Sequence, residues 1–533
     1  MFEIKQVTKR LTAVTALLLG GFVINSHAAT ATYNPSTGLV ELPVVEVLSG
    51  GSSAFYSAQL QLSGSELQLV SAAPIGAASG QRNVFDSDTA AVHIPSVLVG
   101  SDDYYVKLKL VPGSNPLRFS LDQVVSNAFQ GCPSFSTNGP TAGSCILSGT
   151  ITSNVTLTKN IQWILSGGVY IGGDKVQNAT ITINPGTKIF GQSGADYLWI
   201  RRGSKIMAEG TPDNPIVMSG PLQQEPGEWA GLVIAGNAPV NGCNAGVALC
   251  EIPFEAITTE KFGGNNPNDN SGVLKYVQIL FAGAQVRPDE ELNGLTLNGV
   301  GSGTIISHVH VHAGLDDGIE VFGGTAQMKY IVVTDTRDDS LDWTQGWKGR
   351  AQFVLIKQAA DSGDRGIEAD NNEVNHDSAP RAQPILSNMT IIGRNGSAVQ
   401  GVLLRRGTGA NIHNSVITGG FKECVRIDGA STYTNAGSVS SLSGKLTIEN
   451  SFVKCTSNFS DGEGKTFTTA DWFAAQPGNK AVDPLLSGYL PAAGSPLTTG
   501  GSAVGDSFFT IVDYVGAFKD AGSDWTREWT FPF

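Results

Sequence analysis

The chain has 533 residues, of which 41% are hydrophobic and 15% are charged, and its formal net charge is −13. This length is enough for a large core, and the composition excludes a disordered chain. An acidic chain of this kind does not suit nucleic acid or an anionic membrane surface as a partner. We therefore expect no nucleic-acid partner and no insertion into a membrane.

Residues 1–28 have the pattern of a signal peptide for export. Lys5, Lys9 and Arg10 precede an apolar run, and a small-residue cleavage site ends at Ala28. The residue directly after this site is Ala29 rather than a cysteine, so we expect no lipoprotein anchor. The predicted location is extracellular or at the cell surface rather than periplasmic.

Residues 29–125 contain a duplication of short alternating strands. LPVVEV at Leu42 matches IPSVLV at Ile94, and AFYSAQLQL at Ala54 matches DYYVKLKL at Asp103. The pattern predicts a small antiparallel β module made of two copies packed together. Two roles stay open for it, a carbohydrate-binding or docking module and a cap over the first coil of the next domain.

A Gly-, Ser-, Thr- and Pro-rich segment at 126–150 predicts a linker. The six cysteines of the chain fall into three local pairs, although six cysteines formally allow about 15 connectivities. In an exported chain an even count favours disulfides, and no spacing here is typical of zinc. The predicted bridges are Cys132–Cys145, Cys243–Cys250 and Cys424–Cys455.

Between Gly294 and Gly429 one motif recurs with variations: NGLTLNG, DGIEVFGG, DSLDWTQG, RGIEADNN, QGVLLRRG and CVRIDG. The steps are 24 residues (294 to 318), 22 (318 to 340), 26 (340 to 366) and 35 (366 to 401). A second β-branched run lies inside each unit. This periodicity predicts a parallel β solenoid over 151–500, followed by a C-terminal cap or tail at 501–533.

Alternation within each run separates inward from outward side chains. The predicted inward column consists of Leu297, Val321, Trp343, Ala369 and Leu404. The predicted fold class is therefore all-β, a right-handed parallel β-helix preceded by a small antiparallel β module.

The outward positions bring carboxylates into register on successive coils about 4.8 Å apart. Like charges at this spacing repel by about 1 kcal/mol even in water, so we expect bound Ca²⁺, arginine pairing or raised carboxyl pKa values. The candidate acidic face, for binding or catalysis, comprises Asp317, Glu320, Asp339, Asp342, Asp364, Glu368, Asp370, Arg365 and Arg405, with Asp316 and Asp338 at the same corner.

Calcium is the one cofactor that this face suggests, at Glu320, Asp342 and Glu368. A purely structural role is equally open, because Asp and Asn cap the corners of solenoids by accepting hydrogen bonds from backbone N–H groups.

Two further groups of side chains have an open role. His308, His310 and His312 alternate along one strand, which fits either a metal site or an ordinary polar strand face. Trp343 is expected in the core, whereas Trp347 is expected to be exposed and able to stack on a sugar ring.

The segment ITINPGTKIFGQSGADYLWIRRGSKIMAEGTPDNPIVMSG, the motifs GEWAGLVIAGNAPVN and DDGIEVFGGT, and the late DPLL and AGSPL form a specific combination. From about residue 150 to the C-terminus the chain resembles bacterial exported right-handed β-helix proteins of the pectin-lyase-like type. That family includes outer-membrane and surface proteins, among them leptospiral lipoproteins. The resemblance implies the architecture and an exported setting, and little chemistry.

Polysaccharide hydrolases of this fold use two or three Asp on adjacent coils as general acid and base, and lyases use Ca²⁺ with a basic residue. DDG, RDD and the RID at Arg426 superficially resemble a polygalacturonase site, but the Gly-His-Gly element is absent and Arg-Ile-Lys is replaced by Arg-Ile-Asp. We therefore predict an exported surface or extracellular β-helix protein with a structural, adhesive or glycan-binding role. A polysaccharide lyase or glycoside hydrolase is the alternative. A polysaccharide or another cell-surface component is the expected partner, and self-association is open.

Overall fold

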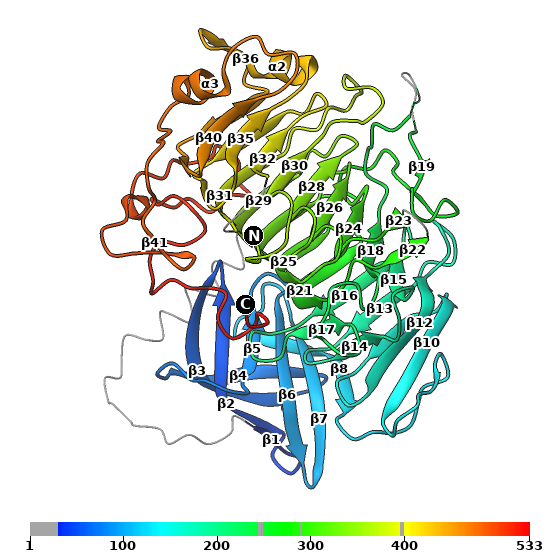
Figure 1. Cartoon of the computed structure of the whole chain (residues 1–533). Coiled ribbons are helices and arrows are strands. Elements are labelled where there is room, and N and C mark those ends of the chain that lie inside the picture. The colour runs from blue at the N-terminus through cyan, green and yellow to red at the C-terminus, as the bar shows by residue number, and fades with distance from the viewer. Residues whose placement is uncertain (1–29, 244–246, 248, 288–289, 395–398) are drawn as a thin grey trace. The chain divides into compact units, whose positions relative to one another are not determined.

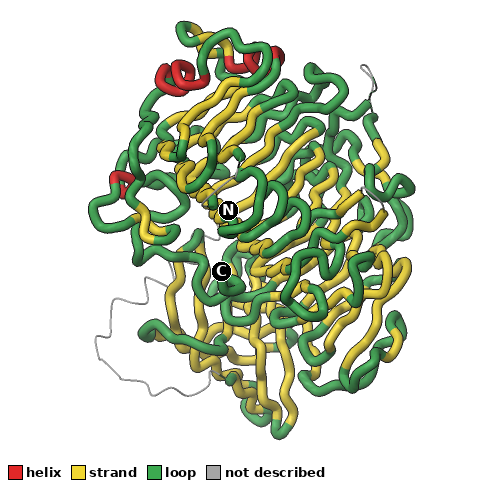
Figure 2. Tube along the Cα trace, viewed as in Figure 1, coloured by secondary structure: helices red, strands yellow, loops and turns green. Residues whose placement is uncertain are grey.

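A computed structural model describes residues 30–243, 247, 249–287, 290–394 and 399–533 (Figure 1). The predicted signal peptide lies outside these residues. The chain divides into two compact units, the first comprising the chain up to Gly131 with Thr158–Ile161 and Thr211–Asn214, and the second comprising the remainder. Strands and the loops between them make up nearly all of both units, and helices are few and short among the described residues (Figure 2). No helix among the described residues has the length and apolar character needed to cross a membrane.

The first unit contains a mainly antiparallel eight-stranded sheet in the order β1-β2-β3-β4-β8-β7-β6-β5. Its strands are β1 (Ala31–Asn34), β2 (Leu39–Ser49), β3 (Ser52–Ser63), β4 (Glu66–Pro74), β5 (Asn83–Asp86), β6 (Ala91–Val99), β7 (Asp102–Leu110) and β8 (Arg118–Ser126).

The duplicated motifs occupy equivalent strands of this sheet, because LPVVEV lies on β2 and IPSVLV lies on β6. β1 pairs antiparallel with β2 of its own copy and parallel with β6 of the other copy. β5 makes the equivalent pairs, antiparallel with β6 and parallel with β2. The first strand of each copy therefore pairs with both copies, and the two copies share one apolar core.

The second unit is a solenoid in which each coil stacks in parallel register on the next. The first sheet of the solenoid contains one short strand from each coil: β15 (Tyr197–Ile200), β18 (Gly231–Ala235), β24 (Leu295–Asn298), β26 (Ile319–Phe322), β28 (Leu341–Thr344), β30 (Ile367–Ala369), β32 (Gln400–Leu404), β35 (Glu423–Ile427) and β40 (Ser457–Asp461).

Longer strands complete the coils in the middle of the solenoid: β21 (Gly272–Leu280), β25 (Ile305–His312), β27 (Gln327–Thr334), β29 (Arg350–Lys357) and β31 (Ile385–Gly393). The early coils also contain β10 (Ser144–Ile151), β11 (Val155–Leu157), β12 (Gln162–Ile171), β13 (Thr180–Ile183), β14 (Lys188–Gly191), β16 (Lys205–Glu209) and β17 (Ile216–Ser219). The late coils contain β33 (Ala410–His413), β34 (Val416–Gly419), β38 (Leu446–Glu449) and β39 (Phe452–Lys454).

The register of the first sheet confirms the inward column predicted from the repeat. Leu297 pairs with Val321, Val321 with Trp343, Trp343 with Ala369, and Ala369 with Leu404. All five side chains are fully buried. The predicted fold class, a parallel β-helix preceded by a small antiparallel β module, is confirmed.

The long strands bend at one residue each, and these residues form a ladder with positive φ. Tyr276, His308, Tyr330, Phe353 and Asn388 have φ between 50° and 59°. The rings of Tyr276, His308 and Tyr330 stack with centroid distances of 4.3 and 4.5 Å. Left-handed backbone costs about 1–2 kcal/mol at a non-glycine residue, and stacking along the bend helps to offset it.

Both ends of the solenoid are covered. At the first coil, β9 (Thr137–Asn138) pairs antiparallel with β10, so the segment predicted as a linker, 126–150, contains strands of the solenoid. At the last coils lie α2 (Ala430–Ala436) and α3 (Thr469–Ala475), and α3 buries Trp472 and Phe473. Covered ends protect the unpaired backbone groups of the terminal strands.

The three predicted disulfides are confirmed: Cys132–Cys145, Cys243–Cys250 and Cys424–Cys455, with Cα atoms 5.6, 5.6 and 5.5 Å apart. Their sequence separations are 13, 7 and 31 residues. The first bridge ties the chain before β9 to β10, and the last joins β35 to the next coil.

Candidate functional site

The first sheet brings the predicted acidic residues together on its outer side. Glu320 pairs with Asp342 across β26 and β28, and Asp342 pairs with Glu368 across β28 and β30. Leu403 follows at the next coil, so the column of carboxylates contains three members. Inward neighbours such as Val321 are fully buried, which fixes the outward direction of these acids.

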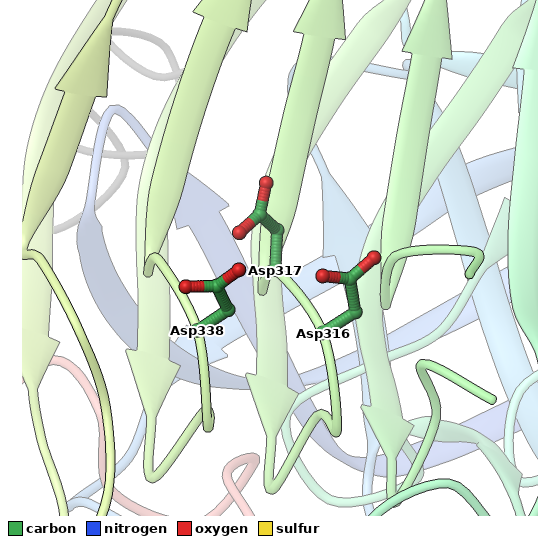
Figure 3. A group of neighbouring side chains, drawn as sticks. All are labelled: Asp316, Asp317 and Asp338. Carbon is green, nitrogen blue, oxygen red and sulfur yellow. The ribbon is translucent and has the colours of Figure 1, made fainter. Parts of the chain in front are cut away.

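The corner before this sheet adds a second row of carboxylates. Asp316 and Asp317 lie at one corner and Asp338 at the next, with their carboxylates turned toward one another (Figure 3). Asp317 Oδ1 accepts a hydrogen bond from the backbone N–H of Asp339 at 3.0 Å, and Asp339 Oδ1 accepts one from Arg365 at 2.7 Å. These two oxygens cap corners, as expected for Asx residues of a solenoid.

Arginines neutralise the downstream part of the acidic face. The Arg365 guanidinium contacts Asp364 at 2.6 Å, Glu368 at 2.7 Å and Asp339 at 3.4 Å. Arg405 also pairs with Glu368. The predicted Arg pairing is therefore present on this side.

Asp370 lies beside this arginine cluster and is held by two guanidinium groups. Arg405 and Arg406 each contact it at 2.9 Å. Burial, opposed by Arg406, raises the pKa of Asp370 to about 6. Arg350 makes no contribution here, because it pairs with Asp506 of the C-terminal segment at 2.6 Å.

The upstream part differs because no Lys or Arg of the described chain forms an ion pair with its acids. Asp316, Asp317, Glu320, Asp338 and Asp342 lie close to one another, and Arg365 and Arg405 act on Asp338 and Asp342 only from beyond ion-pair distance. Glu320 accepts a hydrogen bond from the Asn293 amide at 2.7 Å. Asp342 Oδ1 is buried without a hydrogen-bond partner. We call these five acids the upstream acidic cluster.

Burial and mutual repulsion shift the titration of this cluster. Burial, followed by the charge of Asp338, raises the pKa of Asp316 to about 7. For Asp317, Glu320 and Asp342 burial comes first and neighbouring carboxylates second, and both raise the pKa well above its usual range. Carboxylates in this state need protons or a cation to be stable at neutral pH.

The cluster offers carboxylate oxygens in the spacing that a metal ion needs. Asp317, Glu320 and Asp342 each provide an oxygen within 4.8 Å of the others, as do Asp316, Asp317 and Asp338. Two further groups of three, Asp338–Asp339–Asp364 and Asp339–Asp342–Glu368, include partners of Arg365.

The trio predicted for calcium, Glu320, Asp342 and Glu368, does not form one group. Glu320 and Glu368 lie two coils apart, and among the described residues no group of carboxylate oxygens within 4.8 Å of one another contains both. Asp342 instead joins Glu320 and the corner residue Asp317. Sequence reasoning missed Asn293, although it occupies the position of Asp317 in the preceding repeat.

The other candidate residues have structural roles. Trp347 was expected to be exposed, but it is fully buried, donates a hydrogen bond to Ala326 O and packs against Trp343. His308 and His310 are buried under the C-terminal segment. Among the described residues, every group suited to a metal ion is made of carboxylates alone.

A family model for the pectate-lyase-like β-helix domain matches residues 149–484. The chain belongs to this family. The residues matched by this pectate-lyase-like β-helix model include the acidic face. The N-terminal sheet and the C-terminal segment lie outside the matched residues. No curated protein and no solved structure matches the chain significantly.

Proposed function

We propose that this pectate-lyase-like β-helix protein is exported and binds Ca²⁺ at the upstream acidic cluster, where the ion recruits an extracellular glycan. The observation that carries the proposal is the group Asp317, Glu320 and Asp342, with its close oxygens and no basic partner in the described chain. The buried, unpartnered Oδ1 of Asp342 fits an ion ligand better than a structural cap.

The donor set suits calcium. Calcium takes roughly six to eight oxygen ligands in flexible geometry, with waters and sugar hydroxyls free to complete the shell. A divalent ion also offsets the repulsion that raises these pKa values. The group contains neither His nor Cys, which a zinc site would favour.

Three disulfides support export, because disulfides persist in oxidising compartments. The signal-peptide pattern at 1–28 points the same way.

Thermal unfolding of the mature protein with and without CaCl₂ tests the ion site. A hundredfold excess of Ca²⁺ over its Kd adds about 2.7 kcal/mol of stability. We expect this gain to vanish in Asp342→Asn. It should persist in the matched control Glu373→Gln, whose carboxylate is exposed and lies outside the group. An equal calcium response in wild type and Asp342→Asn would refute the site.

A glycan array, including polyuronates and neutral polymers, tests the binding role. We expect retention of a glycan with Ca²⁺ and its loss with EDTA. Calcium binding without retention of any glycan would leave the ion in a structural role and refute the glycan part alone.

The raised pKa values favour one second candidate, a glycoside hydrolase. A carboxyl whose pKa is raised by burial and by neighbouring carboxylates can act as a general acid beside an ionised neighbour. Oxygens of Glu320 and Asp342 lie within 4.8 Å, closer to the carboxyl separation of about 5 Å in retaining enzymes than to the 6.5–9.5 Å or so of inverting ones. Release of reducing ends by wild type and its loss in Glu320→Gln would establish this activity.

A further inference from the structure

The C-terminal segment is bound along the bends of the solenoid by side chains from successive coils. Asn414 donates a hydrogen bond to Ser502 O at 2.8 Å, and Asn388 donates one to Tyr514 O at 3.1 Å. Gln352 exchanges two hydrogen bonds of 2.8 Å with the backbone of Thr510. Further back along the stack, Gln278 of β21 donates to Trp529 O at 2.7 Å, so the segment, red in Figure 1, runs back toward earlier coils.

The last part of this segment, Trp525–Phe533, lies on the histidines of β25. The rings of Trp529 and His308 are 5.6 Å apart, those of Phe531 and His312 are 5.0 Å apart, and those of Phe533 and His310 are 5.4 Å apart. The backbone N–H of Phe531 donates a hydrogen bond to His310 Nδ1 at 3.1 Å.

These contacts require neutral histidines. Because Phe531 N–H donates to His310 Nδ1, the proton of that ring is on Nε2, which donates to Thr334 Oγ1 at 2.9 Å. The Thr334 hydroxyl then donates its own hydrogen to His312 Nδ1 at 2.8 Å. A proton added to His310 Nδ1 would face the Phe531 N–H donor, and one added to His312 Nδ1 would face the Thr334 hydroxyl hydrogen.

The surroundings also oppose protonation. After burial, the positive charge of Lys275 lowers the pKa of His308, and that of Lys357 lowers the pKa of His312. Asp335 is the nearest acid, 3.9 Å from His312 Nδ1. On the segment itself, Asp524 pairs with Arg527 and Glu528 is exposed. Burial, then Lys357, lowers the pKa of His312 to about 4, and burial lowers the pKa of His310 well below its usual value.

We propose that Trp525–Phe533 is an acid-releasable strap, which protonation of the β25 histidines detaches from the solenoid. Release uncovers the stacked rings of Tyr276, His308 and Tyr330, an aromatic stripe that the strap now buries. Acid would thereby expose an apolar surface without unfolding the coils.

The size of the effect follows from proton linkage. In the released state His310 has an ordinary pKa near 6.5, whereas burial lowers its pKa well below that value in the docked state. Docking therefore weakens by at most about 50-fold between pH 6.5 and pH 4.5 for this one histidine, the limit reached when the docked ring takes up no proton.

Hydrogen exchange of the full mature protein, followed by mass spectrometry and corrected for intrinsic rates, tests the proposal. We expect peptides from 525–533 to lose protection between pH 6.5 and pH 4.5, while peptides from β29 and β31 keep theirs. Unchanged protection of 525–533, or simultaneous loss of protection in β29 and β31, would overturn it.

Two variants separate titration from packing. His310→Gln keeps an acceptor and a donor without a titrating ring, so its strap should stay protected at pH 4.5. His413→Gln is the matched control, since His413 pairs with Glu449 away from the strap, and it should release as wild type does. If peptides from 525–533 of His310→Gln are already unprotected at pH 6.5, the variant does not pack its strap. The proposal is then judged by whether wild type and His413→Gln lose this protection between pH 6.5 and pH 4.5. Release of His310→Gln over the wild-type pH range would refute the role of this histidine.

Discussion

Removal of the Cys424–Cys455 disulfide should destabilise the late coils more than removal of either other bridge destabilises its own region. The bridge spans 31 residues, against 7 for Cys243–Cys250. In the chain-entropy description these separations correspond to about 3.7 and about 2.4 kcal/mol at 25 °C. The expected difference between the two double Cys→Ala variants is therefore about 1.3 kcal/mol.

Hydrogen exchange across a urea series measures the two losses locally, because each bridge lies in a different part of the chain. Peptides from β35 and β39 report on the long loop, and peptides that contain β19 (Ile252–Pro253) report on the short one. An equal or larger loss in the Cys243→Ala, Cys250→Ala variant would refute the argument from loop length. It would mean that native packing around Cys424, which is fully buried, governs these stabilities instead.

Three further predictions follow from the acidic face and the coil contacts. Arg365→Ala should cost about 3–5 kcal/mol in urea unfolding, because it leaves the buried Asp339 without its arginine partner, whereas the exposed Arg337→Ala should change stability by less than about 0.5 kcal/mol. Metal-free protein should be more stable at pH 5 than at pH 8. A carboxyl such as Asp316, raised to about 7 by folding, contributes stability that is present below its unfolded pKa near 3.8 and is lost as the pH rises through 7; a flat profile in EDTA would contradict this. Gly318→Ala should cost about 1–3 kcal/mol, because the new Cβ would meet Ser340 O at 2.7 Å, and Gly505→Ala, with open space around it, should be neutral.

The register of the coils could be predicted from the sequence because a glycine recurs at the same position of several repeats. Gly318 and Gly366 recur where a larger side chain would strike the next coil, so aligning them aligns Glu320 with Glu368 by way of Asp342. Local cysteine pairing was predictable for a similar reason, since Cys424 and Cys455 lie one coil apart.

The remaining features depend on contacts that no local pattern records. Trp347 reads as a surface residue beside Lys348, but the returning chain covers it, and Gln383 N donates to its carbonyl oxygen. The repeat also does not predict which carboxylate of the acidic face forms an ion pair with which arginine. Arg405 lies beyond a 35-residue step, and its reach to Glu368 is decided by how that long excursion closes.

The pairing of each first strand with both copies in the N-terminal sheet has a consequence for how this module can be divided. β1 needs β6 of the other copy and β5 needs β2, so neither copy carries all the partners of its own first strand. A fragment with one copy would present an unsatisfied strand edge. Two such fragments could satisfy each other only by dimerising, with the twofold arrangement that the duplicated chain achieves within one molecule.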